Sequence, residues 1–124
     1  MSPINEYAAV QLLDEAYRHW TGQGLPAPES LTGTERLHWL HEHAPYSLLA
    51  HDTEDDPRFF YGNEQTLACF KYDRSQFLGM PSKFSASPLD RARRQTLLEQ
   101  VTATGIAHGY SGWRVDRDGN AFMI

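Results

Sequence analysis

The spacing of apolar residues changes at Tyr46, and this change constrains the fold more than any other feature of the sequence. Before it, residues 5–20 carry apolar side chains every three or four positions, which is the spacing of an amphipathic helix. After it, residues 46–51 alternate between two sets of side chains, and residues 58–61 form an aromatic run, as strands do. The acidic turn between these runs predicts a hairpin.

Residues with strong capping preferences mark where the other helices begin and end. Gly22 ends the first helix, a second short helix begins at Thr34, and Asn63 is the predicted N-cap of a third helix. Asp73 and Gln76 have the spacing of a capping box, which predicts a fourth. The linker between the first two helices divides the chain into an N-terminal helical part, residues 1–33, and a core, residues 34–124.

The C-terminal third predicts one long helix and two further strands. Ser87 and Pro88 suit the start of the helix, and a strand is expected over residues 106–115. Asp118 and Gly119 predict a tight hairpin turn in which both residues take positive φ, followed by a strand from residue 121. The resulting order is helix, helix, strand, strand, three helices, strand, strand. It predicts an α+β fold in which helices cover one face of one antiparallel sheet.

Length, charge and cysteine content narrow the class of protein. A chain of 124 residues fits one domain, and its formal net charge of -5 disfavours direct binding to nucleic acid. The single cysteine, Cys69, indicates a reducing compartment. The first residues do not resemble a signal peptide, and no stretch has the roughly 20 apolar residues of a membrane span. We therefore expect a cytoplasmic protein.

Four motifs at specific spacings resemble a known family. The stretches SLLAHDTEDDPRFFYGN, FLGMPSKFSASP and YSGWRVDRDG, with YRHWTG before them, are similar to the MEKHLA domain, a PAS-like family. The resemblance covers nearly the whole chain. It implies a PAS-like fold, and it implies a function in sensing a small ligand or cofactor or in dimerisation.

The resemblance also implies a shortage of strands at the C-terminus. In the family, a further segment follows the position of residues 122–124, completes that strand and adds another in the middle of the sheet. Three explanations are open for its absence here: a truncated form, pairing supplied by another copy of the chain, or a sheet that closes differently.

Aromatic residues from several predicted elements are the candidate ligand-binding residues. In a PAS-like fold they would line a cavity between the sheet and the helices that suits a flat or apolar ligand. The alternative is that the same rings fill a solid core. The candidates are Phe59, Tyr61, Phe70, Tyr72, Phe77, Phe84, Tyr110 and Trp113.

A group of histidines on the second predicted helix raises the question of a metal site. His38, His41 and His43 lie close together with Glu42, and imidazole and carboxylate groups suit zinc. Their spacing matches no compact zinc motif, so we interpret them as solvated or capping residues and expect no metal.

Two other features allow catalytic interpretations that we consider weaker. His51 and Asp52 could act as a base and its orienting group, but no nucleophile motif accompanies them, and Asp52 also suits the hairpin turn. Cys69 is interpreted as a small core residue, because the residues around it do not match the pattern of a flavin-adduct cysteine. The long predicted helix contains no histidine that could bind haem, so no haem or covalent flavin is indicated.

The sequence therefore predicts a non-enzymatic, PAS-like sensor that binds a small organic ligand and acts through a homodimer or a separate signalling partner. The helix over residues 5–20 is the expected dimerisation or signal-transmitting element. The alternative is a pure interaction domain with a filled core and no ligand.

Overall fold

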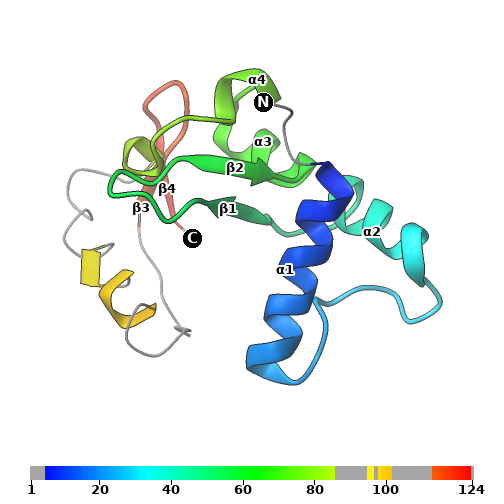
Figure 1. Ribbon diagram of the computed structural model, residues 1–124. Helices are drawn as coiled ribbons and strands as arrows, with labels where there is room; N and C mark the ends of the chain where they lie inside the picture. Colours follow the sequence, from blue (N-terminus) through cyan, green and yellow to red (C-terminus); the bar gives the residue numbers. More distant parts are fainter. Residues whose placement is uncertain (1–4, 86–94, 97, 102–112, 124) are drawn as a thin grey trace.

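The computed structural model describes residues 5–85, 95–96, 98–101 and 113–123 (Figure 1). Residues 95–96 and 98–101 are helical. The other elements, in chain order, are α1 (Glu6–Thr21), α2 (Gly33–Glu42), β1 (Leu49–His51), β2 (Phe59–Gly62), α3 (Glu64–Phe70), α4 (Arg74–Phe77), the 3₁₀ helix η1 (Ser82–Ser85), β3 (Trp113–Val115) and β4 (Ala121–Met123).

The caps of α1 explain its limits. The side chain of Asn5 accepts hydrogen bonds from the backbone N–H groups of Tyr7 and Ala8. At the other end, Gly22 has φ 82°, and its N–H donates to the carbonyl oxygen of Arg18. This left-handed conformation is open to glycine at no steric cost, so the predicted end of the helix is confirmed.

The predicted caps of the next two helices are also present. Asn63 accepts the N–H of Thr66 at the start of α3. Asp73 and Gln76 form the capping box at the start of α4. The predicted left-handed residue after α4 is Gly79, with φ 86°, although the helix itself ends two residues earlier. The 3₁₀ helix η1 had no counterpart among the predicted elements.

The strands form two separate antiparallel hairpins. β1 pairs with β2 through Leu49 opposite Gly62 and Ala50 opposite Tyr61, with an irregularity before His51. β3 pairs with β4 from Trp113 opposite Met123 onwards. Among the described residues no strand joins the two hairpins, so the predicted shortage of strands is confirmed.

The connection between β3 and β4 corrects one prediction. Only Gly119 has positive φ, at 82°, whereas Asp118 does not. The loop spans residues 116–120 and is organised by the buried Asp116, whose carboxylate accepts the N–H groups of Asp118 and Asn120. A side chain that satisfies two backbone donors replaces the tight two-residue turn that the Asp-Gly pair had suggested.

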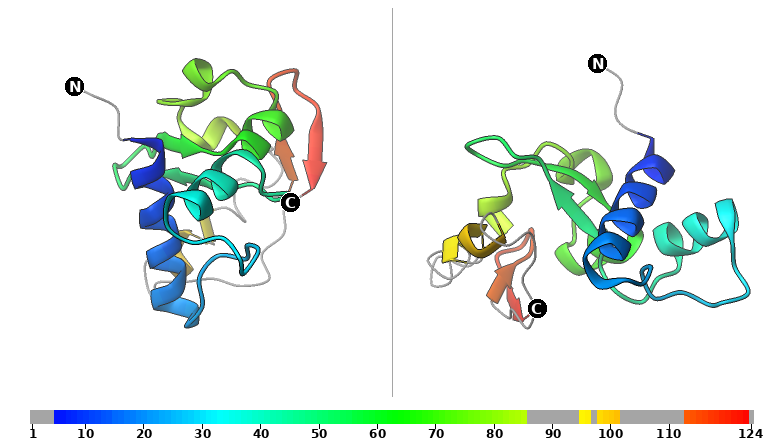
Figure 2. Two further views of the ribbon diagram at one scale, coloured as in Figure 1. Left: turned by 90° about the vertical axis from the view of Figure 1, so that its right-hand side faces the viewer. Right: turned by 60° about the horizontal axis from the view of Figure 1, so that its bottom comes forward.

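The helical pair α1 and α2 shares its core with the β1–β2 hairpin. The two helices lie side by side at one end of this hairpin, and the helical residues 95–96 and 98–101 lie at the other (Figures 1 and 2). The buried cluster that joins them consists of Ala9, Val10, Leu25, Leu40, Leu48 and Tyr61. The division into parts at residues 33 and 34 stays a prediction.

Some predicted elements fall outside the described residues. The predicted helix start at residues 87–88 and the strand residues 106–112 belong to this group. The described part of the predicted helix, residues 95–96 and 98–101, is helical. The described part of the predicted strand, residues 113–115, is extended. Both agree with the prediction. In the described part of the chain, no helix combines the length and apolar character that crossing a membrane requires.

Candidate ligand-binding site

A cavity of about 490 Å³ lies between the two hairpins, α3, η1 and the helical residue Leu98. Its volume falls within the range of about 300–1,000 Å³ that small-molecule sites occupy. The described residues that line it are Ser47, Leu49, His51, Phe59, Cys69, Phe70, Ser82, Ser85, Leu98, Arg114, Phe122 and Met123.

The alternation along β1 decides which of its side chains face this cavity. Ser47, Leu49 and His51 line the cavity, whereas the intervening Leu48 is buried in the cluster shared with α1 and α2. Successive side chains of a strand point to opposite faces, so one short strand serves both the core and the site. The predicted alternation is confirmed.

Stacked aromatic rings form one wall. The rings of Phe59 and Phe77 stack with their centroids 4.4 Å apart, and Phe70 lies 6.1 Å from Phe77. Phe70 also makes an edge contact with Phe122 of β4, at 5.0 Å. Because Phe77 is fully buried behind the rings that line the cavity, it holds the wall in place without facing the cavity.

The polar groups of the cavity come from separate elements. Ser82 and Ser85 are buried, and the hydroxyl of Ser85 donates to the carbonyl oxygen of Ser82 over 2.7 Å. His51 Nδ1 lies 2.7 Å from the backbone oxygen of Asp52 and donates to it. Arg114 is the one charged residue among the described residues of the lining. These groups would orient a mainly apolar molecule.

The carboxylate of Asp52 does not act on His51. It accepts the N–H groups of Glu54 and Arg58, and so it organises the turn between β1 and β2. The interpretation of Asp52 as a turn residue is confirmed.

The structure separates the eight predicted aromatic residues. Phe59 and Phe70 line the cavity, Phe77 supports them, and Tyr72 touches Phe77 at a ring distance of 6.3 Å. Tyr61 is buried in the other core, while Phe84 and Trp113 are 53% and 43% exposed. Tyr110 lies outside the described residues.

Cys69 was expected in the core, and this expectation is wrong. It is half-buried and lines the cavity, with Gln65 Nε2 3.4 Å from its sulfur. The buried side of the short helix α3 is formed by Thr66 and Phe70, which places Cys69 at the edge of that side. Its position on an apolar stretch did not distinguish a core residue from a cavity wall.

A second polar group of interactions connects α1 to the sheet through His41. This histidine was predicted to be solvated or to cap a helix, but it is only 3% exposed. Its Nδ1 shares a 2.7 Å hydrogen bond with the hydroxyl of Tyr61, and its Nε2 lies 3.0 Å from a carboxylate oxygen of Glu6. Burial raises the pKa of Tyr61, so its hydroxyl keeps its proton.

Arg74 extends these interactions to α3 and α4. Its guanidinium contacts Glu6 at 3.2 Å and Glu64 at 2.8 Å, and it donates to the carbonyl oxygen of Gly62. A displacement of β2 or α3 is therefore coupled to the N-terminal turn of α1 through direct polar contacts.

Comparison with known proteins identifies the family. The profile described as the MEKHLA domain matches residues 7–124. The chain belongs to the MEKHLA family. The family resemblance carried by the sequence motifs is thereby confirmed.

Solved structures with a PAS or LOV fold are similar to this MEKHLA domain. One is the structure of an RNA-binding light-oxygen-voltage receptor, with a TM-score of 0.52 and 20% identity; the match covers 82% of this chain and 30% of the receptor chain. Another is the crystal structure of a cysteine-to-serine mutant of Vivid, with a TM-score of 0.50 and 14% identity, covering 87% of this chain and 79% of that one. At these identities the likeness establishes the α+β PAS-like fold.

A search of curated proteins gave no match.

Proposed function

We propose that this MEKHLA domain is a non-enzymatic cytoplasmic sensor that binds a small, mainly apolar organic molecule in the cavity between its two hairpins. The observation that carries the proposal is the cavity itself, of about 490 Å³, with an aromatic wall and a few polar groups from separate elements. This is the composition that small-molecule sites share.

The residues of the wall suggest the chemistry of the ligand. Phe59 and Phe70 offer apolar ring surface, while Ser82 and Arg114 contribute a hydroxyl and a positive charge. The described lining contains neither aspartate nor glutamate. A mainly apolar aromatic compound fits this wall, because burying a charged group against apolar rings costs free energy unless that group is paired.

A sensor must convert binding into a change that a partner detects. The cavity touches both hairpins, and β2 is coupled to α1 through Tyr61, His41 and Glu6. A ligand that favours one arrangement of the hairpins would shift the position of α1, and only such a differential affinity carries information. We propose that α1 transmits the signal to a second copy of the chain or to a separate protein.

One observation favours a second candidate function, that of a pure interaction domain. α1 exposes several large apolar side chains, with Leu12 54%, Tyr17 40% and Trp20 50% exposed. Tyr17 and Trp20 border a shallow groove that continues to Leu49 of β1. Exposed apolar surface of this kind is common where proteins associate. In this alternative the domain associates through α1 and holds no ligand.

The name of the light-oxygen-voltage receptor states RNA binding for that protein, and the charge of this domain disfavours the same function here. This domain has a formal net charge of -5, and a negatively charged surface repels a phosphate backbone.

The cavity can be tested with an aromatic probe. Anilinonaphthalene sulfonate is aromatic and anionic, and its fluorescence rises in an apolar environment. We expect one saturable site in the wild type, loss of that site in Cys69→Phe, where the larger side chain occupies part of the cavity, and retention in the matched control Cys69→Ser. Trp20→Ser, which alters only the groove on α1, should bind the probe normally.

Two outcomes would contradict the proposal. Probe binding that is unchanged in Cys69→Phe would place the site elsewhere. Binding that is lost in Trp20→Ser and kept in Cys69→Phe would place it in the groove on α1, in favour of the interaction domain.

A further inference from the structure

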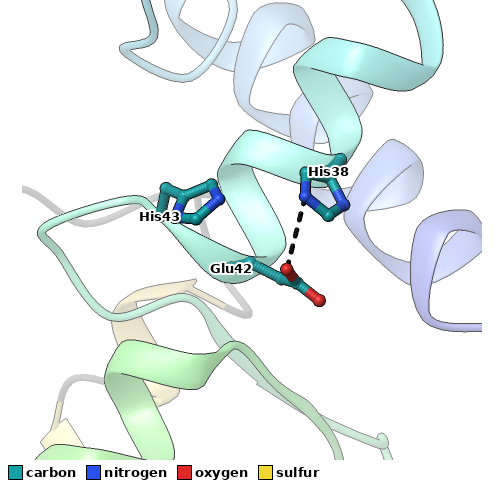
Figure 3. A group of neighbouring side chains, drawn as sticks. All are labelled: His38, Glu42 and His43. Carbon is teal, nitrogen blue, oxygen red and sulfur yellow. Dashed lines mark ion pairs between the residues drawn. The ribbon is translucent and has the colours of Figure 1, made fainter.

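Three side chains with metal-binding atoms gather at the C-terminal end of α2 (Figure 3). His38 and Glu42 are one helical turn apart and project from the same side, and His43 follows at the end of the helix. The atoms that could act as ligands all lie within 4.8 Å of one another. His41, the remaining histidine of this segment, points instead into the core, towards Tyr61.

One pair already has the separation that a metal requires. His38 Nε2 lies 3.3 Å from Glu42 Oε2. Bonds of about 2.0–2.2 Å from zinc to nitrogen and oxygen, in tetrahedral geometry, place two ligand atoms about 3.4 Å apart. His43 is exposed, so its ring is free to rotate towards the pair without displacing buried groups.

Tyr7 of α1 orients the first of these ligands. Its hydroxyl lies 2.8 Å from His38 Nδ1, and the two rings are perpendicular. When a metal replaces the proton on Nε2, the neutral imidazole carries its proton on Nδ1 and donates it to the Tyr7 hydroxyl. Metal-bound histidines commonly have such a partner on the second nitrogen, which holds the ring in position. This contact is independent evidence that His38 presents Nε2 outward.

The surroundings favour a cation. Glu42 is the last residue of α2, and the C-terminal end of a helix carries a partial negative charge. His38 and His43 also border a groove of about 480 Å³ that includes Glu35 and Trp39. A metal bound by these two imidazoles would therefore have neighbouring space for water or for an additional ligand.

We propose that His38, Glu42 and His43 form a binding site for a divalent transition metal, with zinc as the reference ion and Tyr7 as a positioning residue. Two imidazoles and one carboxylate are ligands that zinc, copper and nickel accept, whereas magnesium and calcium prefer oxygen. The spacing of these residues matches no compact motif, because His41 interrupts the run and is directed elsewhere by tertiary contacts. The proposal does not depend on the ligand-binding function of the central cavity.

The test is a calorimetric titration of the whole chain with zinc chloride, in a buffer that does not bind metals. We expect saturation at one zinc per chain. His38→Ala, Glu42→Gln and His43→Ala should each weaken binding at least about tenfold, and Tyr7→Phe by about ten- to a hundredfold. The matched control is His19→Ala, which removes an exposed histidine from α1 and should bind zinc as the wild type does.

Circular dichroism of each variant without metal separates binding from folding. Glu42 is exposed, so Glu42→Gln keeps the shape of the side chain and should leave the fold intact. A wild type that shows no saturable binding would overturn the site. Zinc binding that survives unchanged in a folded Glu42→Gln variant and in His43→Ala would also overturn it. Unchanged binding in Tyr7→Phe would overturn the positioning role.

Discussion

The side chain of Asn63 bonds to α2, to the chain that leads into β1, and to α3, and its replacement gives a sharp test of the fold. It is fully buried. Its Oδ1 accepts a hydrogen bond from the N–H of Leu48 at 3.0 Å. It also accepts two from Thr66, one from the N–H at 3.1 Å and one from the side-chain hydroxyl at 2.8 Å. Its Nδ2 donates to the carbonyl oxygens of Leu40 at 3.0 Å and Tyr46 at 3.1 Å.

The magnitude follows from these five hydrogen bonds. Asn63→Ala removes a helix cap, which costs about 1 kcal/mol. It also leaves buried backbone groups of Leu40 and Leu48 without this partner, at about 1–3 kcal/mol for each group. With partial relaxation we expect a loss of about 3–5 kcal/mol in the free energy of unfolding. That is a large share of the roughly 5–15 kcal/mol that holds a domain of this size together.

Urea unfolding followed by circular dichroism measures this loss. The matched control is Asn5→Ala, which removes the same side chain from the exposed cap of α1 and should cost about 1 kcal/mol. Asn63→Asp keeps the cap but loses both donors, so it should cost about 2 kcal/mol or more. If Asn63→Ala is no more destabilising than Asn5→Ala, the reasoning is refuted.

Three further substitutions test individual contacts. Tyr61→Phe removes the hydroxyl that shares a hydrogen bond with buried His41, so thermal unfolding should show a loss of about 1–3 kcal/mol in the free energy of unfolding. A loss below about 0.5 kcal/mol contradicts the contact. Burial raises the pKa of Asp14, but hydrogen bonds from Arg36 and a backbone N–H outweigh it, and the pKa lies below its ordinary value of 3.8. A carboxylate whose pKa is lowered by folding stabilises the folded state at pH values above its ordinary pKa. The difference in the free energy of unfolding between the wild type and Asp14→Asn should therefore shrink as the pH falls from about 5 to 3, and a difference independent of pH contradicts the account. Gly62→Ala would place a Cβ 2.7 Å from a ring carbon of fully buried Phe77. We therefore expect urea unfolding to show a loss of about 1–3 kcal/mol in the free energy of unfolding, and unchanged stability would contradict this steric conflict.

The helix limits could be predicted because they depend on neighbours in the sequence. The capping bonds of Gly22, of Asn63 and of the pair Asp73 and Gln76 reach groups within four residues, so the types and spacing of these residues were sufficient. The same holds for the two hairpins, each of which joins strands separated by a short loop.

The cavity could not be predicted in the same way, because its wall is assembled from residues far apart in the sequence. Phe59 and Phe70 were among the predicted aromatic residues, but Ser82 and Arg114 carried no signal that distinguished them from other polar residues. The direction of His41 likewise depends on contacts with distant elements. Helical spacing placed His38 and Glu42 on one face, but it did not show which histidine would be buried.

The central claim, that the cavity holds a small organic ligand, is tested most directly by native mass spectrometry of the purified chain and of Cys69→Phe, each compared with its denatured mass. We predict that the wild type carries an additional mass that is lost on denaturation and that Cys69→Phe lacks it. A wild type whose native mass per chain equals its denatured mass would contradict the claim, and a ligand-free dimer would favour the interaction domain.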